Sequence, residues 1–319
     1  MLLTKIFREN LVCIVVDEVH KVTWGAASST SDKPFREAYS QISSFRSIGR
    51  EKVPILALSA TIDGDLTKLV VNSCSLSNRF RTVSSYVHRR NVRLSVVKIK
   101  KKDLNSLTWL LSDLIESYNG NIPFPRSIIF CRSLQLAGWV YVKIFKILKQ
   151  SIPEDLSKLA LGLFHSMTPE NKNKKIILDA LTSDDDNPLK IVIATSSLGC
   201  GVDMKNITYV IHFGPAYDLV DYCQQVGRAG RGNMESLCHG ILYSYSDGRT
   251  QISEKMKSYI NSEQCLRRFL YAPFNNNEIT IESVVPAHKR CIVCAVKCKC
   301  GSCELFSFEK VKLLASAIS

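Results

Sequence analysis

Short apolar runs alternate with helical segments through the middle of the chain, and this alternation limits the possible folds more than any other feature. The apolar runs lie at residues 127–131, 159–164, 190–194, 207–212 and 240–245. Apolar residues recur at helical spacing in the segments between them. Runs without polar alternation are typical of strands buried on both faces of a parallel sheet. The pattern predicts a doubly wound α/β lobe over residues 89–248.

A shorter α/β pattern precedes this lobe, over residues 1–88. The apolar run 11–16 ends in Asp17-Glu18, and the run 53–58 continues into Ser59. We expect a helix over 64–73 and a short strand near Thr82. Ligands of open α/β sheets bind at the carboxyl ends of the strands, which is where the acidic pair would lie. There it would suit Mg²⁺ and the orientation of a water molecule, although such a pair can also serve as a helix N-cap.

Basic residues cluster between the two lobes and are in excess over the whole chain. Lysine and arginine number 42 against 29 acidic residues, a net charge of +13. This surplus favours a polyanionic partner, with nucleic acid first. Arg89-Arg90-Asn91 and the basic run 98–102 mark a boundary that is predicted to be a solvated linker, the alternative being a nucleic-acid patch. No apolar run approaches the ~18 residues of a membrane span, so no membrane partner is expected.

The cysteines are concentrated near the C-terminal end, in a region we assign to a small helical module over residues 249–319. Of the 12 cysteines in the chain, five lie between residues 291 and 303, and Cys265 lies upstream. Such crowding in a large basic chain indicates metal binding in a reducing compartment rather than disulfides.

Five short motifs occur in an order that resembles motifs II to VI of superfamily 2 helicases. They are Asp17-Glu18-Val19-His20, Ser59-Ala60-Thr61, the segment 127–132, the segment 195–203 and the segment 224–231. The resemblance implies two RecA-like lobes that bind ATP between them and nucleic acid across their tops. The fold class expected is therefore α/β, with two RecA-like parallel-sheet lobes, the first incomplete, followed by a small zinc-binding module.

The resemblance also implies roles for single residues. Asp17 would hold Mg²⁺, Glu18 and His20 would serve hydrolysis, and Arg231, with Arg228 beside it, would act as an arginine finger, because guanidinium grips phosphate oxygens bidentately. The remaining residues implied are Gln224 in catalysis, Ser59, Thr61, Gly201 and Asp203 at the nucleotide, and Thr195 at the nucleic acid.

Further residues narrow the resemblance to RecQ DNA helicases. Trp24-Gly25 and Phe35-Arg36 resemble the aromatic-rich loop that couples single-stranded DNA to ATP hydrolysis in that family, although residues 26–33 lengthen the gap between them. Aromatic faces stack on bases without reading sequence. Arg89-Arg90-Asn91 resembles the segment that opens the second RecQ lobe.

The RecQ resemblance extends to a structural zinc site. Cys265-Leu266-Arg267-Arg268 resembles the Cys-Arg-Arg helix of that region, and His288, Cys291 and Cys294 follow at metal-ligand spacing. Cys298 is the rival of His288 for the fourth position. Cys298, Cys300 and Cys303 could otherwise form a second, incomplete site or remain free thiols.

One expected motif is absent from the sequence. No Gly-Lys-Ser or Gly-Lys-Thr occurs, so the phosphate-binding loop is missing, and only 16 residues precede Asp17. We therefore interpret the chain as an N-terminally truncated RecQ-like ATP-dependent 3′–5′ DNA helicase, inactive alone, whose first sheet leaves apolar surface and a strand edge exposed. The alternative is a non-catalytic fragment that binds single-stranded or duplex DNA or another partner. An RNA helicase is disfavoured by the aromatic loop and the zinc ligands. The resemblance implies an intracellular, nuclear location.

Overall fold

The chain forms two compact units. The computed structural model describes residues 4–25, 42–44, 53–84, 89–120, 123–169, 173–184, 187–199, 202–231, 236–246, 251–274, 284–303, 306 and 309. The first unit comprises Met1–Val87 with Ala272–Ile279, and the second comprises His88–Tyr271 with Thr280–Ser319.

The first unit is built around two short parallel strands. Its elements are α1 (Lys5–Asn10), β1 (Ile14–Val16), the 3-10 helix η1 (Val19–Gly25), β2 (Ile55–Ala57), α2 (Gly64–Ser73) and the 3-10 helix η6 (Ala272–Phe274). Asp63 caps α2 by accepting a hydrogen bond from the Leu66 amide. The small core consists of Val19, Val22, Ile42, Leu66, Val70 and Cys74.

This unit has less strand than the sequence predicts. β1 covers three residues rather than 11–16, with Val12 83% exposed before it, and the described residues 81–84 contain no strand where one was expected near Thr82. Within the described residues its sheet holds two strands, and the paired residues Val15 and Leu56 leave 55% and 49% of their surface exposed. The sequence predicts exposed apolar surface of this kind in the first unit.

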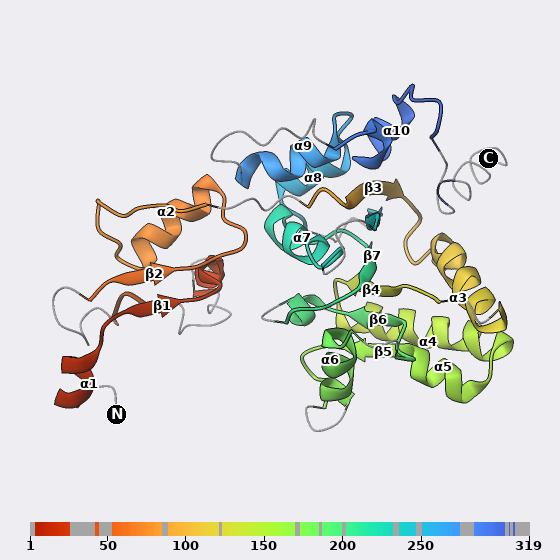
Figure 1. Cartoon of the computed structure of the whole chain (residues 1–319), viewed down its shortest axis with the longest axis horizontal. Coiled ribbons are helices and arrows are strands. Elements are labelled where there is room, and N and C mark those ends of the chain that lie inside the picture. The colour runs from red at the N-terminus through yellow and green to blue at the C-terminus, as the bar shows by residue number, and fades with distance from the viewer. Residues whose placement is uncertain are drawn as a thin grey trace. The chain divides into compact units, whose positions relative to one another are not determined.

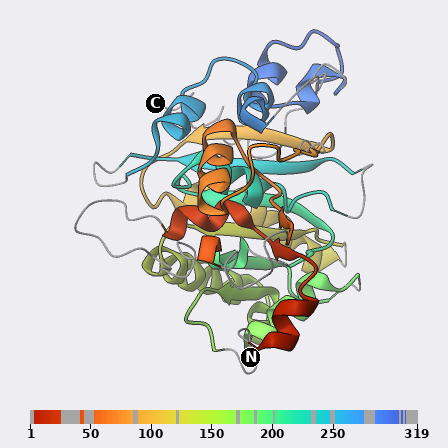
Figure 2. The same ribbon diagram turned by 90° about the vertical axis from the view of Figure 1, so that its left-hand side faces the viewer.

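The second unit contains a six-stranded parallel sheet in the order β3-β8-β7-β4-β6-β5 (Figures 1 and 2). The strands are β3 (Val92–Lys98), β4 (Arg126–Cys131), β5 (Leu161–Phe164), β6 (Ile191–Ala194), β7 (Ile207–Phe213) and β8 (Cys238–Ser244). Every residue of β4, β6 and β8 is buried, which explains the continuous apolar runs. The predicted doubly wound lobe is confirmed.

Helices flank this sheet. They are η3 (Leu104–Leu107), α3 (Thr108–Gly120), α4 (Leu134–Ser151), α5 (Glu154–Ala160), α6 (Lys175–Thr182), η5 (Ser196–Gly199), α7 (Leu219–Val226), α8 (Glu254–Ile260), α9 (Leu266–Tyr271), η8 (Ala287–Lys289) and α10 (Ile292–Val296). Figure 1 shows α9 and α10 beside β3, at the edge of the sheet opposite β5. Residues 251–271 and 284–303, which the sequence suggested as part of a separate module, thus lie in the same unit as the sheet.

The edge strand β3 was not predicted from the sequence, which marks only residues 89–91 and 98–102 on either side of it as a linker-like boundary. Residues 92–98 pair in parallel with β8 along their whole length, from Val92 opposite Cys238 to Lys98 opposite Ser244. Arg93 and Ser95 are buried within this strand. No helix in the described part of the chain is long and apolar enough to cross a membrane.

Candidate functional site

The acidic pair lies in a strained turn directly after β1. Glu18 has φ +49°, a left-handed conformation that side chains other than glycine adopt rarely. Its amide donates to Asp17 Oδ1 at 2.8 Å, and the next amide, of Val19, donates to the Leu58 carbonyl at 2.8 Å. Such strain is typical of functional sites. The turn keeps Asp17 exposed at the carboxyl end of the strand.

His20 connects this turn to the segment that follows β2. Its Nδ1 lies 3.0 Å from Ser59 Oγ and 3.3 Å from Glu18 Oε2. The Ser59 hydroxyl donates to the Thr61 carbonyl and accepts from the Thr61 amide, so the proton between His20 and Ser59 belongs to His20 Nδ1. Burial, and next Lys21, lower the pKa of His20 to about 4 against the pull of Asp17, so it is neutral at pH 7.

Part of the expected nucleic-acid loop lies outside the described residues. Trp24 belongs to η1, with its backbone described and its side chain not, while Phe35 and Arg36 fall in the segment that is not described. Gly201 is likewise outside the described residues. Their proposed roles stay predictions.

In the second unit, motifs V and VI occupy two ends of the same sheet. Thr195 follows the carboxyl end of β6, where its hydroxyl lies 3.0 Å from that of Ser197. Asp203 and the turn 227–230 lie at the opposite, amino end of β7, because the Gly230 amide donates to the Ile207 carbonyl at 2.9 Å. Helix α7 runs back along the sheet and so carries motif VI to that end.

The two motif VI arginines have different surroundings. Arg228 is buried and its Nη1 donates to the Val202 carbonyl, which ties it to motif V. Arg231 Nη1 lies 2.7 Å from Asp203 Oδ1, with 29% of the arginine side chain and 74% of the aspartate side chain exposed. This hydrogen bond lowers the pKa of Asp203. The Arg231–Asp203 pair is therefore open to solvent and able to exchange for a ligand, whereas Arg228 is fixed.

Asn91 and Gln225, which were not predicted as site residues, hold the motif VI segment in place through hydrogen bonds. Asn91 Nδ2 donates to the Gly230 carbonyl at 3.1 Å, and Gln225 Oε1 accepts from His212 Nε2 at 2.7 Å. Gln224, the predicted motif residue, is partly exposed on the other side of the helix turn. The resemblance of Arg89-Arg90-Asn91 to the RecQ segment was the available signal for Asn91. Nothing in the sequence distinguishes Gln225 from Gln224 as the residue that holds His212.

Gly230 is required by its backbone conformation, and we expect Gly230→Ala to destabilise the motif VI turn. Its φ is +69°, and an added Cβ would lie 2.4 Å from Asn91 Nδ2. Strain of this kind costs about 1–3 kcal/mol, measurable as a loss of unfolding free energy in urea. Gly138→Ala is the control, since nothing lies within 4 Å of its Cβ position in α4 and alanine favours helix. Equal stability of the two variants would contradict the account.

The buried His212 makes the second unit sensitive to acid. Burial lowers its pKa to about 4, against the pull of the Gln225 hydrogen bond, so the folded form stays neutral below pH 6.5 while the unfolded chain takes up a proton. Unfolding free energy should therefore fall by up to about 3 kcal/mol as pH drops from 6.5 to 4. When unfolding free energy is measured by urea titration at several pH values in that range, its slope against pH should be shallower in His212→Gln than in the parent chain, by the equivalent of one proton. An unchanged slope would exclude His212 as the cause.

The metal-ligand candidates fall into two groups. The Sγ atoms of Cys265, Cys291 and Cys294 lie within 4.8 Å of one another, with Cys265 and Cys291 Sγ 4.0 Å apart. The hydrogen bond from Cys291 lowers the pKa of Cys265 to about 5, which favours the thiolate that binds metal. Three thiolates suit zinc and leave one of its four positions for another donor. His288, the predicted fourth ligand, lies with Cys298, Cys300 and Cys303 instead.

Comparisons with known proteins find similarity to helicases. Residues 109–233 match the model of the helicase conserved C-terminal domain. The chain is 28% identical to the putative ATP-dependent RNA helicase R290 of Acanthamoeba polyphaga mimivirus, covering 84% of this chain and 46% of that protein. It is 26% identical to the mouse bifunctional 3′-5′ exonuclease/ATP-dependent helicase WRN (84% and 19%) and 25% identical to the ATP-dependent DNA helicase RecQ of Bacillus subtilis (83% and 43%). The chain thus spans less than half the length of these relatives.

Solved structures share the fold. Dbp5 of S. cerevisiae, bound to RNA and ADP BeF3, superposes with a TM-score of 0.54 at 16% identity, over 85% of this chain and 59% of that one. The Mycobacterium smegmatis helicase Lhr, bound to ssDNA and AMP-PNP, gives a TM-score of 0.52 at 22% identity, over 76% and 30%.

Proposed function

We propose that this chain, a RecQ-like helicase of superfamily 2, supplies motifs II to VI to an ATP-hydrolysing enzyme. That enzyme would couple ATP hydrolysis to 3′–5′ movement on single-stranded DNA and would unwind duplex DNA. The observation that carries the proposal is the placement of motifs V and VI. Thr195 lies at one end of the second sheet and Arg231 with Asp203 at the other, which supports a nucleic-acid face and a nucleotide face on the same unit. We propose that the enzyme acts in the nucleus.

The first unit would contribute the acidic residues. We propose that Asp17 holds Mg²⁺ and that Glu18 orients the attacking water. His20, which contacts both Glu18 and Ser59, would couple the position of this turn to that of Ser59 and Thr61. The strained Glu18 backbone and the neutral imidazole hold the turn in one arrangement. When bound, ATP with Mg²⁺ supplies the phosphoryl group that these residues serve.

The second unit would contribute positive charge. We propose Arg231 as the arginine finger, since it is permanently charged and its exposed pairing with Asp203 can exchange for a phosphate. Arg228 then fixes the turn to motif V, and Asp203 is released toward the nucleotide sugar. The residues present fit the metal side and the arginine side of an ATP site, while Gly-Lys-Ser/Thr is absent from the 319 residues.

We propose a nucleic-acid path across the carboxyl ends of the strands. A cavity of about 210 Å³ opens there, lined by Arg132, Ser196 and Tyr217 among others. Tyr217 is 56% exposed, and the Arg132 guanidinium lies 5.9 Å from its ring centre. An exposed aromatic ring beside a cation suits stacking on a base and contact with a phosphate. Trp24, Phe35 and Arg36 of the first unit remain the further proposed contacts.

Binding to a labelled single-stranded oligonucleotide tests this path. We expect the chain to bind with an affinity that falls steeply with salt, as phosphate neutralisation requires. Tyr217→Ala should weaken binding by about 1–3 kcal/mol, or roughly 5- to 150-fold, because one stacked base is lost. Tyr217→Phe is the matched control and should retain the affinity. Equal binding by all three chains would remove Tyr217 from the path.

A second function, DNA binding without hydrolysis, is favoured for the 319-residue chain itself by the missing phosphate loop. We expect this chain to show no ATPase activity in the presence of single-stranded DNA. DNA-stimulated hydrolysis by the chain alone would overturn that expectation. Strand displacement on duplexes with 3′ or 5′ tails, by an enzyme that combines these motifs with a phosphate loop, tests the direction of movement.

A further inference from the structure

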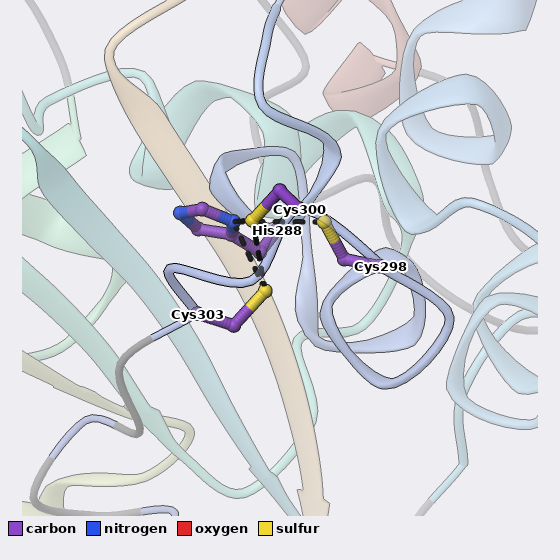
Figure 3. A group of neighbouring side chains, drawn as sticks. All are labelled: His288, Cys298, Cys300 and Cys303. Atoms are coloured by element: carbon purple, nitrogen blue, oxygen red, sulfur yellow. Dashed lines mark hydrogen bonds between the residues drawn. The ribbon is translucent and has the colours of Figure 1, made fainter.

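Four side chains near the C-terminal end of the described chain converge on a common point. Figure 3 shows the sulfurs of Cys298, Cys300 and Cys303 directed at the imidazole of His288. His288 Nδ1 lies 3.7, 3.2 and 3.3 Å from these three Sγ atoms, respectively. Cys300 and Cys303 Sγ are 3.2 Å apart, and the four ligand atoms all lie within 4.8 Å of one another.

These separations approach those of a tetrahedral zinc site. With Zn–S near 2.3 Å and Zn–N near 2.0 Å, neighbouring ligand atoms stand about 3.5–3.8 Å apart. The donor set of three sulfurs and one imidazole nitrogen is one of the usual closed sets for structural zinc, and soft thiolates with tetrahedral geometry select it over harder cations. The group needs no fifth residue to complete it.

The local backbone brings these ligands together. Gly301, with φ +76°, lies between Cys300 and Cys303 and turns the chain so that both sulfurs face the same point. On the other side, His288 lies in η8, and its carbonyl accepts a hydrogen bond from Arg93 Nε of β3 at 2.8 Å. The backbone of His288 is thereby held to the edge of the second sheet, while the cysteines come from the loop after α10.

The loop 298–303 has little else to hold it. Cys300 and Cys303 are exposed and Cys298 only partly buried, and the loop contains no regular secondary structure. A segment that buries so little apolar surface commonly needs a cross-link or a metal for order. The residues that follow, Phe306 and Glu309, return to Arg93, so a fixed loop would position both of them.

We propose that His288, Cys298, Cys300 and Cys303 form a second zinc site, separate from the group of Cys265, Cys291 and Cys294. The two groups share no ligand. The second ion would hold the C-terminal loop against β3, a folding role independent of the helicase activity proposed above. Because two of its ligands are exposed, this ion exchanges faster with a chelator than an ion held by the buried Cys291.

Zinc content of the purified 319-residue chain tests the proposal. We expect two equivalents per chain, released to a chelator in two phases with the exposed site first. His288→Ala and Cys300→Ser should each reduce the content to one equivalent and remove the fast phase, while Cys265→Ser should remove the slow phase. Cys13→Ser, a thiol outside both groups, is the control and should keep both equivalents.

Cobalt distinguishes the ligand sets. Replacement by Co²⁺ should give a tetrahedral visible spectrum, and Cys300→Ser and His288→Ala should each remove the share of the thiolate charge-transfer and ligand-field bands that the second ion contributes. The proposal would be overturned if the parent chain held one equivalent of zinc and His288→Ala held the same amount. That result would be expected if Cys298 completed the first group, or if Cys300 and Cys303 formed a disulfide. Cooperative unfolding of His288→Ala should be retained, which would show that the variant loses its metal because a ligand is missing and not because the protein is misfolded.

Discussion

Replacement of Cys291 by serine is expected to release one zinc ion and to unfold much of the C-terminal part of the second unit. Cys291 is fully buried and pairs with Leu94 of β3 in an isolated bridge, next to the 3.2 Å hydrogen bond from the Leu94 amide to the Arg290 carbonyl. Structural zinc contributes about 10–16 kcal/mol of apparent folding energy in small modules, and a serine hydroxyl does not replace a thiolate ligand. We therefore expect the loss to exceed that of any single packing change in the unit.

A buried thiol outside the metal groups separates metal loss from packing loss. Cys131 in β4 is 3% exposed and lies in the main core, so Cys131→Ser also places a hydroxyl among apolar side chains. That variant should lose on the order of 1–3 kcal/mol and keep its full zinc content. Zinc analysis with circular dichroism compares the two. A Cys291→Ser protein with parental zinc content would remove Cys291 from the ligand set.

The parts of the fold that were predictable are those where one local property decides the outcome. β4 and β6 are buried on both faces, and their burial alone produces the apolar runs that identify them. α2 begins at Asp63, whose side-chain cap is a local interaction. The motifs were recognisable for a similar reason, because each is a short segment with fixed spacing.

The parts that were missed depend on partners distant in the sequence. β3 lies between two basic segments and carries Arg93, so no buried strand is evident there until Glu309, 216 residues later, is seen to pair with that arginine. The sequence spacing of His288 is compatible both with a site shared with Cys291 and Cys294 and with a site formed with the later cysteines. The path of the chain after α10, which brings Cys298, Cys300 and Cys303 back to the imidazole, places His288 with them instead.

Arg93 should be among the most sensitive residues of the second unit, and Arg93→Met is expected to cost about 3–5 kcal/mol of unfolding free energy. The side chain is 1% exposed, forms a 2.5 Å ion pair with Glu309 and stacks over Phe306 with its guanidinium carbon 4.4 Å from the ring centre. Methionine keeps the length of the stem but leaves the Glu309 carboxylate buried without its charge partner. It also removes the Nε donor to the His288 carbonyl, so the affinity of the exposed zinc site should fall as well.

A double-mutant cycle with Glu309→Gln isolates the ion pair. If burial of an unpaired carboxylate is the main cost, Arg93→Met combined with Glu309→Gln should be more stable than Arg93→Met alone, and the coupling should be measurable in urea unfolding. The zinc effect should persist in the double variant, because it arises from the lost hydrogen bond to His288 and not from the charge. Lys158→Met, which breaks the exposed pair with Glu154 on α5, is the control and should leave both stability and zinc content unchanged. Strictly additive effects of the two substitutions would mean that Arg93 stabilises the unit through Phe306 and His288 alone.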